Sequence, residues 1–175
     1  MAAFSAPALA TTTVVNGSCV SVTDVHGCLF SGNINEQPTG NNSYGDAQNA
    51  YNLYNNTHPS ADPDITLTYL AKSDLSGFPG TVTGGSSSGN WSLPGYLVDF
   101  IAVKAGPDFV LYELSSPASS GTWSTADLGG KDLSHLEFFG TVAPVPEPAS
   151  WAMLVAGLGA VGVAMRRRRA QVSFA

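Results

Sequence analysis

One pentapeptide in this chain has the spacing of a hydrolase nucleophile. Residues 85–89 read G-S-S-S-G and fit the pattern G-x-S-x-G, with Ser87 at its centre. Asp99 or Asp108, followed by His135, would complete the chain order Ser, Asp, His. That motif needs a buried strand before the serine and a helix after it, whereas here a Gly/Ser-rich stretch precedes another strand-like run. We interpret it as a hairpin loop and predict no catalytic residues and no enzyme activity.

A second group of residues offers hard oxygen ligands. Asp62 and Asp64 flank a proline, and their carboxylates suit Ca²⁺, but the glycine and the distal Glu of a dedicated calcium loop are missing. An Asx-rich turn is the default, and Ca²⁺ binding stays an open alternative. His26, His58 and His135 lack metal-ligand spacing, and His135 is expected to be a satisfied structural residue. The sequence predicts no cofactor.

Two tryptophans and two cysteines complete the candidates. Trp91 and Trp123 stand in similar G-x-W-S contexts. We interpret both as core residues, with a carbohydrate-stacking platform as the alternative. Cys19 and Cys28 are the only cysteines, and in an exported chain such a close pair is expected to form a disulfide. A reactive or metal-binding thiol pair is the other interpretation.

The charge distribution excludes nucleic-acid binding. Of 175 residues only 11% are charged, against about a quarter in ordinary soluble domains. There are 7 Lys+Arg and 13 Asp+Glu, and four of the bases form a single run near the C-terminus. The remaining lysines, Lys72, Lys104 and Lys131, cannot form the basic face that phosphates require.

The N-terminus has part of an export signal. Ala8 and Ala10 form the small-x-small pattern of a signal-peptidase site. A basic n-region and a full-length apolar region are missing before it. We expect residues 1–10 to be the remnant of a truncated signal peptide, with the true start upstream, and the mature protein to begin near Thr11.

The C-terminal segment has three parts in a fixed order. A Pro-rich linker at 143–148 precedes an uncharged stretch at 149–165, and a basic tail follows at 166–175. As a helix the stretch spans roughly 25 Å, close to the shortest that crosses a membrane core of about 30 Å. The sequence predicts a single transmembrane helix with its basic end inside the cell. The stop-transfer residues are Arg166, Arg167, Arg168 and Arg169.

This order of parts resembles the PEP-CTERM sorting signal, whose segment has also been called an ice-binding protein C-terminal domain without implying ice binding. The motif residues are Val145, Pro146, Glu147 and Pro148. The resemblance implies recognition by exosortase, a membrane transpeptidase-like enzyme that removes the helix. It also implies that the protein passes outward, commonly in organisms that make extracellular polysaccharide.

Residues 11–142 are expected to fold as one exported β-rich domain. Strand-like runs occur at 20–25, 65–72, 96–104, 109–114 and 135–141, with a tight turn at 106–108. One short helix is predicted with Asp46 as its N-cap and with Ala47, Ala50, Tyr51 and Tyr54 on one face. The fold class is mainly β, an antiparallel, jelly-roll-like β-sandwich with one short helix and the C-terminal transmembrane helix.

These observations predict a non-enzymatic exported protein. The precursor is expected at the inner membrane with its N-terminus outside, and the processed protein at the cell surface or in the extracellular polysaccharide matrix. The alternative is a polysaccharide- or Ca²⁺-binding module using Trp91, Trp123 and the Asp62 region. A glycan hydrolase is a third hypothesis, and it would need two carboxylates about 5 to 9.5 Å apart across a groove.

Overall fold

The computed structural model describes residues 13–14, 27–57, 63–144 and 148–169. The chain divides into two compact units between Ala143 and Pro144. The first holds all the described strands, one α-helix and one short 3₁₀ helix, and the second holds the C-terminal helix. Each unit is described by itself.

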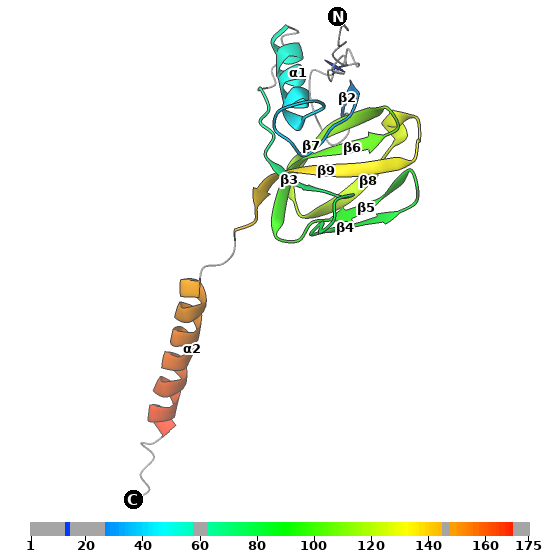
Figure 1. Cartoon of the computed structure of the whole chain (residues 1–175). Coiled ribbons are helices and arrows are strands. Elements are labelled where there is room, and N and C mark those ends of the chain that lie inside the picture. Colours follow the sequence, from blue (N-terminus) through cyan, green and yellow to red (C-terminus); the bar gives the residue numbers. More distant parts are fainter. Residues whose placement is uncertain (1–12, 15–26, 58–62, 145–147, 170–175) are drawn as a thin grey trace, which may run out of the picture. The chain divides into compact units, whose positions relative to one another are not determined.

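A six-stranded antiparallel sheet forms the centre of the first unit (Figure 1). Its strand order is β1-β2-β7-β6-β9-β3. The strands are β1 (Thr13–Val14), β2 (Cys28–Ser31), β3 (Tyr69–Lys72), β6 (Tyr96–Ala105), β7 (Asp108–Ala118) and β9 (Leu133–Val142). β6 and β7 form the predicted hairpin, in which Ala105 pairs with Asp108 and Gly106 takes a positive φ of 62° at the turn.

A second sheet of three antiparallel strands, in the order β4-β5-β8, covers one face of the first. Its strands are β4 (Thr81–Gly84), β5 (Ser88–Ser92) and β8 (Ser120–Ser124). The two G-x-W-S segments are neighbours here, since Trp91 pairs with Gly121 and Gly89 pairs with Trp123. A short 3₁₀ helix, η1 (Ala126–Leu128), follows β8. Both tryptophans belong to the hydrophobic core between the sheets, which confirms the core interpretation.

Helix α1 (Tyr44–Thr57) packs on the opposite face of the six-stranded sheet. Ala47 and Tyr51 are buried, and Ala50 and Tyr54 pack beside them, so the predicted helix face is confirmed. The predicted N-cap, Asp46, was wrong, because the N-cap is Ser43, three residues earlier. Ser43 caps the helix and Asp46 reaches back to it, with Asp46 N donating to Ser43 Oγ at 3.1 Å and Ser43 N donating to Asp46 Oδ2 at 3.2 Å.

Both faces of the six-stranded sheet are therefore buried, by different layers. Along β6, Phe100 and Ala102 face α1, whereas Ile101 and Val103 face the small sheet. This alternation of two apolar faces makes β6 a continuous hydrophobic run. The expectation of a mainly β protein with antiparallel sheets and a short helix is confirmed, and the jelly-roll assignment stays a prediction.

The strand predicted at 65–72 is shorter than expected and begins at Tyr69. The backbone before it bonds to side chains of α1. Ile65 exchanges two hydrogen bonds with the Asn52 amide, at 2.9 and 3.0 Å, and Leu67 N donates to Gln48 Oε1 at 2.8 Å. Because these amides are satisfied by the helix, this segment does not join a sheet. The strand predicted at 20–25 lies outside the described residues.

The second unit contains α2 (Pro148–Arg169). A helix forms where the sequence predicts one, but among the described residues no helix is long and apolar enough to cross a membrane, so the transmembrane prediction is not upheld. The uncharged stretch 149–165 is rich in Ala and Gly and spans only roughly 25 Å as a helix, below a core of about 30 Å.

Cys28 is fully buried on β2, beside Phe30 and in the core under α1. Its predicted disulfide partner, Cys19, lies outside the described residues, so the pairing stays a prediction. The signal-peptidase residues Ala8 and Ala10 also lie outside the described residues.

Candidate functional site

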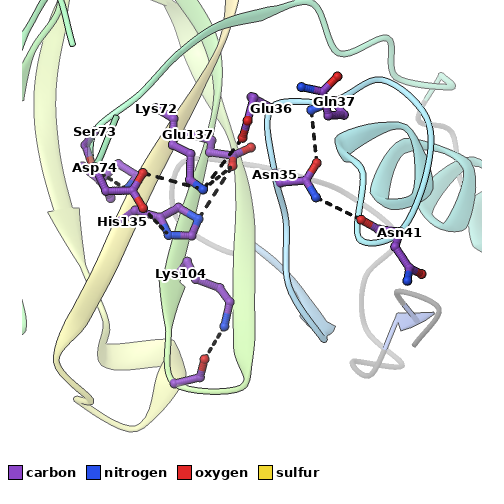
Figure 2. A network of polar contacts seen from close by, with 12 residues as sticks. Asn35, Glu36, Gln37, Asn41, Lys72, Ser73, Asp74, Lys104, His135 and Glu137 are labelled. Atoms are coloured by element: carbon purple, nitrogen blue, oxygen red, sulfur yellow. Dashed lines mark hydrogen bonds and ion pairs between the residues drawn. The ribbon is translucent and has the colours of Figure 1, made fainter. Parts of the chain in front are cut away.

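A cluster of ionisable side chains lies on the α1 face of the six-stranded sheet (Figure 2). Strand pairing brings its centre together, because Lys72 on β3 is directly opposite Glu137 on β9. Two residues before Glu137 on β9, His135 is opposite Lys104 on the other neighbouring strand, β6. His135 and Glu137 are two residues apart on one strand and so point to the same face. We call Glu36, Lys72, Asp74, His135 and Glu137 the Glu137 cluster.

A register shift in β3 lets Lys72 face this cluster. The pairing of β3 with β9 is interrupted between Tyr69 and Ala71, and a bulge there changes which face the following residues occupy. Ala71 consequently joins the core between the sheets, and Lys72 turns toward Glu137. The edge position of β3 leaves its lysine within reach of residues outside the sheet.

Glu137 is the most enclosed member of the cluster. Its side chain is 0% exposed, and both carboxyl oxygens lack a hydrogen-bond partner within the described part of the protein. The nearest opposite charge is Lys72 Nζ, 3.9 Å from Oε1. His135 Nε2 lies 3.7 Å from the same oxygen, beyond hydrogen-bond range. Burial raises the pKa of Glu137 to about 8, with the charge of Lys72 opposing the rise.

Lys72 is shared by three carboxylates. Besides Glu137, its Nζ lies 3.6 Å from Asp74 Oδ1 and 3.9 Å from Glu36 Oε2. Its side chain is only 11% exposed, whereas those of Glu36 and Asp74 are partly open to solvent. Three carboxyl groups therefore surround one ammonium group. The net charge of the cluster depends on whether Glu137 is protonated.

His135 is buried but not fully satisfied, which corrects the expectation. Its Nδ1 lies 3.7 Å from Asp74 Oδ2, and Nε2 has no hydrogen-bond partner among the described residues. Burial, assisted by the charge of Lys72, lowers the pKa of His135 to about 4, so the ring is neutral at pH 7. The neighbouring Lys104 is buried too, and its ammonium donates to the carbonyl of Gly106.

The cluster is suited to proton storage and charge balance more than to substrate chemistry. Because Glu137 has no exposed surface, it does not touch a polymeric substrate in this conformation. No group of three or more metal-ligating side chains occurs among the described residues. Tyr69 at the edge shares the environment, as burial and the charge of Glu137 raise its pKa to about 12.

A separate cavity of about 520 Å³ opens between the two sheets. It lies where β7 leaves its pairing with β6. Glu113 is opposite Phe100 and Ala118 is opposite Val98, so four residues of β7 face a single residue of β6. This excursion supplies Ser115 and Ser116 to the lining. The other lining residues are Trp91, Ile101, Val103, Tyr112, Leu114, Ala118, Gly121, Thr122, Trp123, Ser124, Ala126 and Asp127.

The tryptophans of this cavity show little surface. Trp91 is 3% and Trp123 is 5% exposed, and Gly121 and Phe138 pack against the Trp91 ring. A sugar could not stack on these indoles as the alternative interpretation requires. The accessible chemistry comes from the rim, where the Tyr112 hydroxyl donates to Asp127 Oδ2 at 2.8 Å.

The residues of the apparent hydrolase triad have other partners. Ser87 lies in the β4–β5 hairpin loop, and its carbonyl accepts from Thr125 N at 2.9 Å. Asp108 pairs with Lys131 at 3.6 Å, whereas His135 lies 3.7 Å from both Asp74 and Glu137. The hairpin-loop interpretation agrees with this placement.

The calcium candidate is only partly described. Asp62 falls outside the described residues, and Asp64 accepts a hydrogen bond from Asn56 Nδ2 at 3.4 Å. Among the described residues, Asp64 belongs to no group of three or more His, Cys, Asp or Glu side chains that could hold a metal ion.

The sorting motif is where comparison with known proteins succeeds. Residues 144–169 match the family model of the PEP-CTERM protein-sorting motif. Val145, Pro146 and Glu147 lie outside the described residues, and Pro148 begins α2. No curated protein and no solved structure matches the chain. The C-terminal segment is therefore a PEP-CTERM motif, which implies processing by exosortase, and the match includes none of the strands.

Proposed function

We propose that this protein is an exported exosortase substrate whose folded domain is delivered to the cell surface or the extracellular matrix. The observation that carries the proposal is the PEP-CTERM match at 144–169, which begins where the first compact unit ends, at Ala143. A processing enzyme could therefore remove the whole motif without cutting any strand of the β domain.

The exposure and charge of the two units support the removal of one and the release of the other. The large apolar side chains of α2 between Trp151 and Met165 are each 57% to 77% exposed. The cores of the first unit, in contrast, are built from residues up to Phe139. Residues 11–142 hold twelve acids and three bases, a net charge of −9, which favours solubility after release.

The motif itself supplies a plausible recognition element. Prolines at 144, 146 and 148 fix φ at alternate positions and favour an extended strip that an enzyme cleft can bind. Glu147 stands between two of them and offers one carboxylate to a cationic group of the enzyme. The four arginines mark the opposite end of the signal.

Substitution of the motif tests this proposal. In a host that makes exosortase, Glu147→Gln or Pro146→Ala should leave the precursor unprocessed in the membrane fraction, while the unaltered chain is released. Glu113→Gln, an exposed carboxylate of β7 outside the motif, is the matched control and should be released normally. Equal release of all variants would contradict recognition through Pro-Glu-Pro.

The role of the delivered domain is a second part of the proposal. We infer a non-enzymatic surface role, and the cavity at the β7 excursion favours a binding function with a neutral, polyhydroxylated ligand. Its rim carries Ser, Thr and Tyr hydroxyls and the carboxylate of Asp127, and no lysine or arginine lines it. Anionic polysaccharides are disfavoured because the domain already carries −9.

Titration of a neutral glycan into the full chain, followed by tryptophan fluorescence, tests the cavity. Binding should alter the emission of Trp91 and Trp123. The substitution Ser116→Trp fills the rim of the cavity and should abolish glycan binding. Ser73→Trp is unsuitable as a control because Ser73 Oγ accepts from Leu136 N at 2.8 Å. Thr81→Trp on the exposed edge of β4 serves instead and should retain binding.

A further inference from the structure

The segment between β2 and α1 covers the Glu137 cluster. Ile34 is 0% exposed in the core beneath α1, and His135 hydrogen-bonds to the Ile34 backbone. Two residues later, Glu36 reaches Lys72. Residues 33–43, which we call the cap, thus contact β3 and β9 through Glu36 and the ionisable cluster (Figure 2), and they contact the core through Ile34.

Internal bonds hold the cap together as one piece. Asn35 Nδ2 donates to Asn41 O at 2.9 Å, and Gln37 N donates to Asn35 Oδ1 at 3.1 Å. A bridge joins Asn35 to Ser43, next to the first turn of α1. Because these bonds close within the cap, they do not depend on the Glu137 cluster.

The groups that face Glu137 come from several elements. Lys72 and Tyr69 belong to β3, Asp74 follows β3, His135 is on β9, and Glu36 is on the cap. Lys104 on β6 lies next to His135, but its ammonium is engaged by Gly106 O. Lys72 is therefore the cation that the three carboxylates share.

We propose that Glu137 and Lys72 form a proton-dependent latch for the cap. When Glu137 is protonated, Lys72 pairs with Glu36 and Asp74, and the cap is held in place. When Glu137 ionises, its carboxylate competes for Lys72 and repels Glu36, so the cap loosens. The proton leaves to solvent as the cap opens, and no other bond is made or broken.

The pH window follows from the two buried groups. Glu137 has a raised pKa of about 8 while the cap is closed. At any pH between 4.5 and 8, opening of the cap therefore releases the Glu137 proton to solvent. His135 has a lowered pKa of about 4 in the closed state, so below about pH 6.5 its imidazole binds a proton when the cap opens. This proton uptake offsets the proton release from Glu137 in that pH range. Loosening should therefore be seen between pH 6.5 and 8.

Hydrogen exchange of the full chain in detergent micelles tests the latch. After correction for the intrinsic exchange rate, protection of cap amides should fall about tenfold or more from pH 6.5 to pH 8.5, because one proton is released per opening. Glu137→Gln, which mimics the protonated side chain, should remove this fall. The control Glu113→Gln should keep it.

Amides of β6 and β9 separate local opening from global unfolding. The latch requires that their protection changes much less than that of the cap over the same range. Equal protection of the cap at both pH values would overturn the proposal. So would an unchanged fall in Glu137→Gln, or a parallel loss of protection in the cap and the central strands.

Discussion

Glu137 carries a carboxyl group that the fold keeps away from water, on the strand next to the edge of the six-stranded sheet. Its neighbours on β9, Leu136 and Phe138, pack into the core between the sheets, so Glu137 faces α1 and the cap. From the sequence, a Glu alternating with large apolar residues indicates a strand with a solvated face. Its burial results from a layer that is distant in sequence, and strand alternation alone could not reveal that layer.

The pH dependence of stability should report this group directly. Because the folded-state pKa of Glu137 is raised to about 8, its proton is retained on folding, and stability should fall as pH rises toward 8. Between pH 6.5 and 8 this amounts to about 2 kcal/mol. Urea unfolding of Glu137→Gln should show a flat profile over that range. A wild-type profile that is equally flat would contradict the raised pKa.

Lys72 should be costly to remove by itself. Lys72→Met removes the shared cation of three carboxylates and should lower stability by about 3 kcal/mol at pH 9, where Glu137 is ionised. Adding Glu137→Gln to it should restore part of the loss, since one buried acid is then neutral at every pH. Lys131→Met is the matched control. Its partner pair with Asp108 is partly exposed, and its loss should cost less than about 1 kcal/mol in chemical denaturation.

At the scale of elements, the long strands β6, β7 and β9 and the short strand β3 were predictable, whereas the strands of the small sheet were not. β6, β7 and β9 carry dense apolar and β-branched residues, which is the signal that a buried strand leaves in a sequence. β5 and β8 read SGNWS and SGTWS, with one large side chain each. Gly and Ser have low strand propensity, so these strands depend on pairing and on the two tryptophans for their existence.

Close backbone approach in the small sheet gives a prediction at this scale. A Cβ on Gly89 would lie 1.8 Å from Thr83 O on the neighbouring β4 strand, so Gly89→Ala should force the hairpin apart. We expect a loss of about 1 to 3 kcal/mol in urea unfolding. Gly85→Ala in the adjoining loop meets nothing closer than 3.9 Å and should be nearly neutral. Equal effects of the two substitutions would contradict the close contact.

At the scale of the whole molecule, the chain combines a folded β domain with a C-terminal segment that matches a sorting motif. The sorting motif could be identified from sequence because it is linear, with its parts in a fixed order at one end. The cluster and the cavity could not, because they depend on strand register and on layers joined by tertiary contacts. The net charge of −6 belongs to all 175 residues, whereas residues 11–142 carry −9.

Because the chain divides into two compact units, we expect the β domain to fold stably without its C-terminal segment. Ending the chain after Ala143 should leave the melting temperature of the β domain within a few degrees of the full-length value, because both hydrophobic cores lie before that residue. Circular dichroism melts of the two forms would measure this. A large drop on truncation would mean that residues 144–175 stabilise the domain.

The most direct test of the central claim is the intact mass of the protein exported from a host with exosortase and from the same host without it. Processing predicts that the released form lacks α2 and the arginines and ends within or close to the Pro-Glu-Pro segment, only where the enzyme is present. An identical C-terminal mass in both hosts, with residues 148–175 retained, would contradict the account.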